Sequence, residues 1–161
     1  MNILSNIFDG VSKYIELSKT YRSSKEIIDY SNKVLGLNHV CAVRRENNLP
    51  VIEYDKLNYS KLIEEINRLK SIYSNVAIIT KSSESANVIY ENIKDKINNI
   101  ELIKPTTERF NKELIIIPTY IAKGLEFDSV IIINDFNQEK YLYYVAITRS
   151  QHELVVFNST N

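Results

Sequence analysis

Two arginines of this 161-residue chain stand where they could bind phosphate. Arg22 directly precedes Ser23, and Ser23 with Glu26 three residues on has the spacing of a capping box at a helix N-terminus. The free N–H groups of such a terminus favour anions, and a guanidinium beside it offers a planar fork that matches phosphate. The ring of Tyr21 could stack on a base. A surface arginine and a half-buried tyrosine flanking the cap remain the alternative at this point.

Arg149 ends the string Tyr-Val-Ala-Ile-Thr-Arg, in a region whose pattern predicts a helix over about residues 138–149. An arginine there can stabilise the negative charge on a phosphoryl group during transfer. It can equally be a cation that interacts favourably with a helix C-terminus. The local chemistry leaves both interpretations open.

Residues 117–128 form the most distinctive stretch of the chain, Ile-Pro-Thr-Tyr-Ile-Ala-Lys-Gly-Leu-Glu-Phe-Asp. Apolar runs at 114–117 and 130–133 flank it, which predicts a polar turn between two buried strands. That turn carries Thr119, Lys123, Gly124 and Glu126. Because α/β proteins place ligand sites at strand ends, we expect a ligand site here, along one edge of the sheet.

The elements that must position these residues alternate between strands and helices. Apolar runs predict strands at 51–54, 76–80, 100–103, 114–117, 130–133 and 154–157. Helical patterns run from the Ser23 cap to Gly36, over 62–73, from a cap at Ser82 or Ser83 to 97, and over 138–149. Several strands are apolar on both faces, as in a parallel sheet covered by helices. We expect one three-layer α/β domain over residues 1–161.

The composition excludes several other classes of protein. With 44% hydrophobic and 25% charged residues the chain is ordinary for a globular protein, and a formal net charge of zero argues against binding nucleic acid by bulk electrostatics. The single Cys41 excludes an internal disulfide framework. No apolar run reaches the roughly 18 residues that span a bilayer, and residues 1–10 lack the basic and apolar pattern by which we would expect a signal peptide. We expect a cytoplasmic protein without a membrane partner.

The chain lacks a phosphate-binding loop of its own. Its three glycines are Gly10, Gly36 and Gly124, and none begins a G-x-x-x-x-G-K-[ST] motif. Without that loop Asp135, which follows the apolar run at 131–133, is better explained as a turn residue than as a magnesium ligand. No metal-ligand spacing occurs either, so we expect no metal site within this chain.

Three strings, taken in order, resemble motifs IV, V and VI of UvrD/Rep-like superfamily 1 helicases. They are Tyr-Arg-Ser at 21–23, Thr-Tyr-Ile-Ala-Lys-Gly-Leu-Glu-Phe-Asp at 119–128, and Tyr-Val-Ala-Ile-Thr-Arg at 144–149. The chain is thus similar to the C-terminal RecA-like domain of such an enzyme. Residues 24–118 leave no room for the large insertion of UvrD and Rep, so the resemblance is nearest to the helicase IV/HelD branch. It implies a RecA-like fold and a piece of a longer chain.

The resemblance implies a role for each matching residue. Tyr21 would stack on adenine, and Arg22 and Arg149 would reach the γ-phosphate of ATP as catalytic cations. Glu126 would bind the ribose, and Gly124 would allow either a tight turn or a close backbone approach to the nucleotide. The phosphate loop and the ligands of Mg²⁺ would come from an N-terminal RecA-like domain.

Thr119 would contact the backbone of the nucleic acid. Tyr120 stands where UvrD and Rep carry histidine, and its ring could stack on a base.

The function implied is that of the C-terminal motor domain of an ATP-dependent DNA helicase or translocase, which acts on single-stranded DNA. We expect the isolated domain to hydrolyse no ATP. The alternative is a non-catalytic helicase-like module that binds RNA polymerase or another protein, which the neutral net charge and the missing phosphate loop favour.

Overall fold

A parallel sheet forms the centre of the molecule. The computed structural model describes residues 18–36, 40–43, 48–109 and 113–159, and the features below refer to these. Within them the main sheet has six strands in the order β3-β8-β7-β4-β6-β5, and every neighbouring pair is parallel. The strands are β3 (Ile52–Tyr54), β4 (Val76–Thr80), β5 (Glu101–Leu102), β6 (Leu114–Pro118), β7 (Phe127–Asn134) and β8 (Ser150–Asn158).

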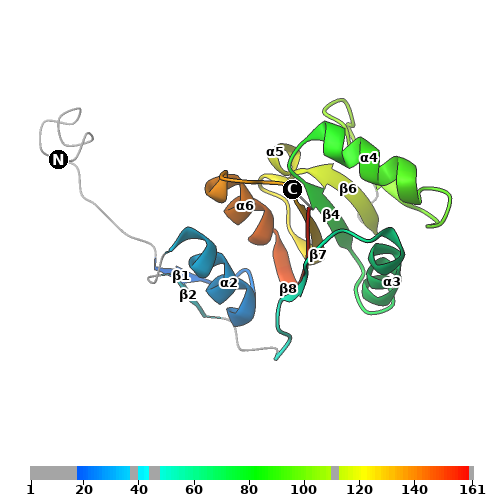
Figure 1. The fold of residues 1–161 in the computed structure, drawn as a ribbon. Coiled ribbons are helices and arrows are strands. Elements are labelled where there is room, and N and C mark those ends of the chain that lie inside the picture. The colour runs from blue at the N-terminus through cyan, green and yellow to red at the C-terminus, as the bar shows by residue number, and fades with distance from the viewer. Residues whose placement is uncertain (1–17, 37–39, 44–47, 110–112, 160–161) are drawn as a thin grey trace, which may run out of the picture.

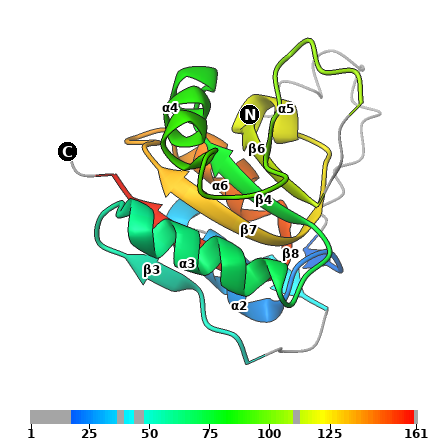
Figure 2. The ribbon, with the colours of Figure 1, turned by 90° about the vertical axis from the view of Figure 1, so that its right-hand side faces the viewer.

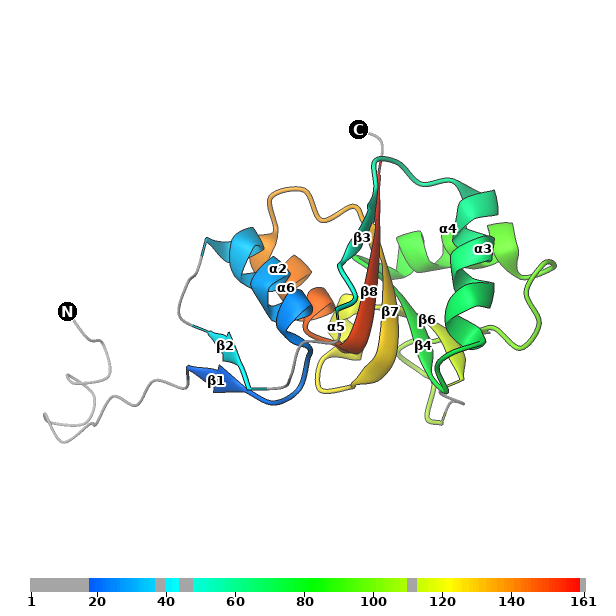
Figure 3. The same cartoon turned by 90° about the horizontal axis from the view of Figure 1, so that it is seen from below.

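Helices cover both faces of this sheet (Figures 1 and 2). Seen along the sheet in Figure 3, one face carries α2 (Lys25–Leu35), α5 (Thr119–Ala122) and α6 (Lys140–Ile147). The other face carries α3 (Tyr59–Lys70) and α4 (Ser83–Ile93). The prediction of a three-layer, RecA-like α/β domain is confirmed.

Two apolar cores fill the spaces between the layers. Successive residues of β4 alternate between them: Ala77 and Ile79 pack in the core beneath α2, α5 and α6, and Val76 and Ile78 pack in the core beneath α3 and α4. This alternation follows from the two-residue period of a strand. It explains why β4 and β6 are buried at every position.

The entry into α2 differs from the prediction. Ser24 is the N-cap, and no side chain caps this helix. The Ser23 hydroxyl instead donates a 2.6 Å hydrogen bond to the carbonyl of Ser150. The predicted capping box at Ser23 is therefore wrong, because this serine is used to attach the helix to β8. The end of the helix is as predicted, since Gly36 has the left-handed conformation with φ +67°.

A short parallel pair is formed by β1 (Lys19–Thr20) and β2 (Cys41–Ala42), and β1 directly precedes the Tyr21-Arg22 segment.

The predicted polar turn after β6 begins as a helix, α5, which buries Thr119 and Ala122 one turn apart. In the described part of the chain, none of the helices combines the length and the apolar character that a membrane span requires.

Candidate functional site

The amino ends of β7 and β8 lie side by side and present two of the predicted site residues together. Glu126 directly precedes β7, and Arg149 directly precedes β8. Phe127 is in register with Ser150, and its N–H donates a 3.0 Å hydrogen bond to the carbonyl of Arg149. The parallel pairing thus fixes Glu126 beside Arg149, although they lie in different motifs.

The start of α2 adds a third segment to the same place. The N–H of Ser24 donates a 3.0 Å hydrogen bond to the carbonyl of Gln151, one residue after the carbonyl that accepts the bond from Ser23. Arg22 then extends to Glu126, with 2.5 Å between Nε and the carboxylate oxygen Oε1. The fold therefore joins Arg22, Glu126 and Arg149 at the amino edge of the sheet.

The Glu126 carboxylate is kept ionised by its neighbours. Partial burial acts to raise its pKa, but a 2.8 Å hydrogen bond from Gln151 Nε2 and the charges of Arg22 and Arg149 outweigh it, so that the pKa is lowered. Sequence reasoning missed Gln151. The signal was available, because Gln151 lies two residues after Arg149 and the period of a strand places alternate residues on one face.

Arg149 is a buried cation, with 7% of its surface exposed. Its guanidinium donates to the carbonyls of Val145 and Leu125 and to the hydroxyl of Thr148, at 2.9, 3.2 and 3.2 Å. These bonds use three of its five N–H groups. Burial lowers the pKa of Arg149, and the charge of Arg22 lowers it further against the opposing effect of Glu126. A dehydrated cation near a second cation is an environment that favours a bound anion.

Tyr21 and Gly124 complete this edge. Tyr21 is 73% exposed, with no hydrogen bond or ring contact to the described residues, so its ring is accessible for stacking. Gly124 has φ +89°, and a Cβ built there meets nothing within 4 Å. Only glycine adopts this backbone conformation easily, so of the two predicted roles the tight turn explains why glycine stands at this position.

The predicted nucleic-acid residues lie at the opposite edge of the sheet. Thr119 follows the carboxyl end of β6, where Pro118 is in register with Thr80 at the end of β4. Ile132 of β7 is in register with Ile79 of β4, so six residues of β7, from Phe127 to the level of Thr80, separate this edge from the Glu126 edge by about 20 Å, at about 3.3 Å per residue. The prediction that residues 117–128 form one edge is wrong, because in a parallel sheet they must run from a carboxyl edge to an amino edge.

Thr119 and Tyr120 also differ in how accessible they are. Thr119 is fully buried, and its hydroxyl donates a 2.8 Å hydrogen bond to the carbonyl of Thr80. Tyr120 is 53% exposed, and its hydroxyl shares a 2.9 Å hydrogen bond with that of Ser83. The aromatic ring of Tyr120 can therefore meet a ligand, whereas the Thr119 side chain serves the junction of β4 and β6.

Asp135 holds the turn after β4. Its carboxylate accepts hydrogen bonds from the Lys81 N–H and the Ser85 hydroxyl, as suits a structural residue at a strand end. Among the residues that the structure describes, no group of three or more His, Cys, Asp and Glu side chains is arranged to hold a metal ion.

Comparison with solved structures places this fold among helicase domains. The chain is similar to the C-terminal domain of a possible DNA helicase from Lactobacillus plantarum WCFS1, with 26% identity and a TM-score of 0.70 over 87% of this chain and 88% of that one. It is also similar to PRRSV helicase, with 16% identity and a TM-score of 0.51, over 94% of this chain and 25% of that one. No protein-family model matches the chain, and no curated protein does.

These similarities support a helicase-related C-terminal domain. They do not separate the UvrD/Rep type or the HelD branch from other helicases, and they lend no support to RNA polymerase as a partner.

Proposed function

We propose that this chain is the C-terminal motor domain of an ATP-dependent DNA helicase or translocase of the UvrD/Rep type. It completes an ATP site whose phosphate loop and Mg²⁺ ligands belong to an N-terminal RecA-like domain. The observation that carries the proposal is the convergence of Arg22, Glu126 and Arg149 at one edge from three separate segments, with 2.5 Å between Arg22 and Glu126.

The residues at this edge fit a nucleoside triphosphate. Arg149 holds a desolvated positive charge with N–H groups left to donate, and Arg22 supplies a second charge that repels it. An incoming polyphosphate relieves that repulsion. Such paired cations stabilise the charge on a transferring phosphoryl group.

The other residues recognise the nucleoside. The ionised Glu126 accepts hydrogen bonds from ribose hydroxyls, and Gln151 keeps its carboxylate in place. The exposed ring of Tyr21 stacks on the adenine. When bound, the magnesium nucleotide supplies the phosphoryl group and the charge on which these residues act.

The opposite edge is the side that contacts the track. Single-stranded DNA passes Thr119 and Tyr120, and the exposed tyrosine ring contacts a base. The stretch from Thr119 to Glu126 connects the two edges, so it is suited to couple nucleotide binding to movement on DNA.

The experiment compares Mg²⁺-dependent ATP hydrolysis by the 161-residue chain with hydrolysis by the longer protein that carries the phosphate-loop domain. We expect no turnover by the chain alone. In the longer protein Arg149→Ala should lower kcat by roughly a thousandfold or more, because it removes a charge-stabilising arginine. Arg109→Ala, at an exposed arginine between β5 and β6, is the matched control.

Two results would overturn the proposal. Turnover by the 161-residue chain alone would mean that no second half is required. An unchanged rate in Arg149→Ala would favour a helicase-like module that binds another protein without using nucleotide.

A further inference from the structure

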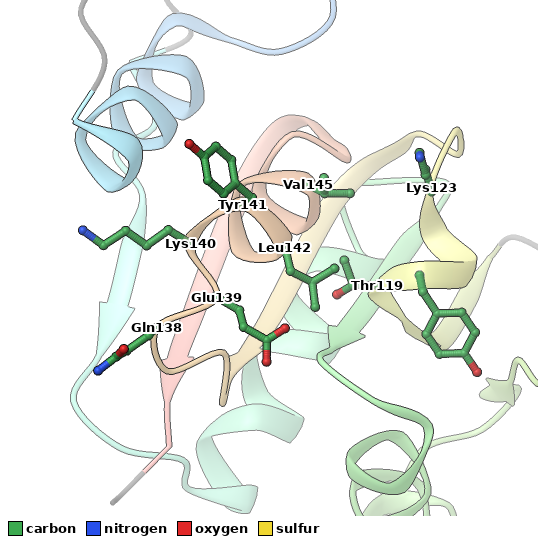
Figure 4. A pocket seen from close by; sticks show the side chains of 9 residues that line it. Thr119, Lys123, Gln138, Glu139, Lys140, Tyr141, Leu142 and Val145 are labelled. Carbon is green, nitrogen blue, oxygen red and sulfur yellow. The ribbon is translucent and has the colours of Figure 1, made fainter.

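A pocket of about 530 Å³ lies at the carboxyl edge of the sheet, between α5 and the start of α6 (Figure 4). Most of its lining comes from the edge opposite Arg22 and Glu126, and Val145, whose carbonyl accepts a hydrogen bond from Arg149, lies on the side toward the nucleotide residues. Its volume is in the range of pockets that hold small organic groups. Its lining comprises Thr119, Tyr120, Lys123, Gln138, Glu139, Lys140, Tyr141, Leu142 and Val145.

The interior of the pocket is apolar and well supported. Leu142 and Val145 lie one turn apart on α6, and Leu142 packs against the core beneath the helix. Tyr120 lines the pocket from α5, and its hydrogen bond to Ser83 restrains the ring. A flat aromatic group can therefore enter between aliphatic side chains and a restrained ring.

The rim of the pocket is positively charged. Lys123 and Lys140 are exposed, and neither ammonium group has a partner among the described residues. The acidic lining residue, Glu139, is neutralised by an ion pair of 2.5 Å with Lys81. The pocket thus combines an apolar interior with two unpaired cations at its mouth.

Tyr141 adds a second ring at the rim, and 81% of its surface is exposed. In Figure 4 it points outward from α6, next to Lys140. A large exposed ring beside unpaired lysines is the pattern of surfaces that bind single strands by stacking bases and neutralising phosphates.

We propose that this pocket receives one unpaired base of a single-stranded nucleic acid. The base lies between Leu142, Val145 and Tyr120, Tyr141 stacks on the next base, and Lys123 and Lys140 meet the phosphates. The inference rests on the proposed function for the presence of a strand at this edge, and it assigns residues of α6 to the binding of that strand. A strand is favoured over a protein segment because the site offers positive charge, unpaired among the described residues, around an apolar space.

The test measures binding of the 161-residue chain, without nucleotide, to a fluorescein-labelled oligo(dT). An abasic strand with the same number of phosphates is the comparison. Tyr120→Ala and Tyr141→Ala should each weaken binding of oligo(dT) by roughly fivefold to a hundredfold, the range found for loss of one stacked base. Tyr141→Phe keeps the ring and should bind as the parent chain does.

The lysines are tested by the dependence of binding on salt. Lys123→Gln with Lys140→Gln should lower the slope of log K against log salt concentration by about 1.4, since each phosphate contact contributes about 0.7. Lys96→Gln, at an exposed lysine near the end of α4, should leave the slope unchanged.

Equal affinity for the abasic strand and oligo(dT), or no binding of either, overturns the base pocket. If Tyr141→Ala alters the sedimentation of the chain and leaves oligonucleotide binding unchanged, the pocket is a contact between protein molecules and the inference also fails. The assay contains no ATP, so these failures are distinct from loss of ATPase activity in Arg149→Ala, which tests the proposed function.

Discussion

Replacement of Arg149 by methionine should leave the stability of the domain nearly unchanged, whereas the same change at Arg68 should destabilise it strongly. The two arginines are both held in the fold but differ in their partners. Arg68 bridges two buried carboxylates, at 2.7 Å to Glu65 and 2.6 Å to Glu153. Arg149 donates to neutral oxygens and lies near the charge of Arg22.

The pKa shifts have opposite signs for this reason. Burial acts to lower the pKa of Arg68, but the two carboxylates outweigh it and the pKa is raised. Burial lowers the pKa of Arg149, and Arg22 adds to that effect. Folding therefore favours the charged form of Arg68 and disfavours that of Arg149.

The expected free energies follow from these contacts. Arg68→Met leaves Glu65 and Glu153 buried without their cation, which should cost about 3 kcal/mol, the lower end of the range for broken buried pairs because Arg68 is 36% exposed. Arg149→Met loses three hydrogen bonds from a charged group, worth about 1.5 kcal/mol each, but it also removes the desolvation of a buried cation, which is several kcal/mol. The net change should lie within about 1 kcal/mol of zero.

The assay is urea denaturation of the 161-residue chain followed by circular dichroism. The parent and the two variants should unfold with the same slope against urea, and only Arg68→Met should have a clearly lower midpoint. If Arg149→Met loses as much stability as Arg68→Met, Arg149 is a structural residue, and its assignment to the γ-phosphate loses its physical basis.

Three further changes test the amino edge. In the longer protein Gln151→Leu should raise KM for ATP about fivefold with little change in kcat, since it removes a partly exposed hydrogen bond to Glu126. An unchanged KM would exclude a positioning role for Gln151. Gly124→Ala should destabilise the chain by about 1 kcal/mol in urea, because φ is +89°. The pKa of Glu126 in the folded chain is lower than its ordinary value of 4.5, so its ionised form contributes stability above pH 4.5. That contribution is lost as the pH falls through the lower folded pKa. In Glu126→Gln the free energy of unfolding should therefore fall less steeply with pH below 4.5.

Much of the fold could be predicted from the sequence because the apolar runs are short and clearly bounded. The predicted strand at 76–80 coincides with β4, and the run at 114–117 falls within β6. Glycine at position 36 ended a helix as expected. The order of the strands could not be predicted in this way, since β4 lies between β6 and β7 although it precedes both in the chain.

The site was predicted less completely. Motif resemblance selected Arg22, Glu126 and Arg149, and the structure brings these side chains to one edge. The long-range hydrogen bonds from Ser23 and Ser24 to β8 could not be predicted from the local sequence, because they depend on how α2 packs against that strand. The pocket beside α6 was missed for a similar reason, since its two sides are separated by the whole of β7.

The stretch from Thr119 to Glu126 connects the carboxyl edge of the sheet to its amino edge, which suits it to couple the two sites. Its first residue is hydrogen-bonded to the end of β4 through Thr80, and near its last residue the carbonyl of Leu125 accepts a hydrogen bond from Arg149. Glu126 is paired with Arg22 in this structure, so a ribose that binds Glu126 must share it with Arg22 or displace it. Either change alters the contacts at one end of a segment whose other end adjoins the pocket of Tyr120. A short segment anchored at both ends can transmit such a change only if it moves as a unit. If it does, the affinity for single-stranded DNA should change when nucleotide binds.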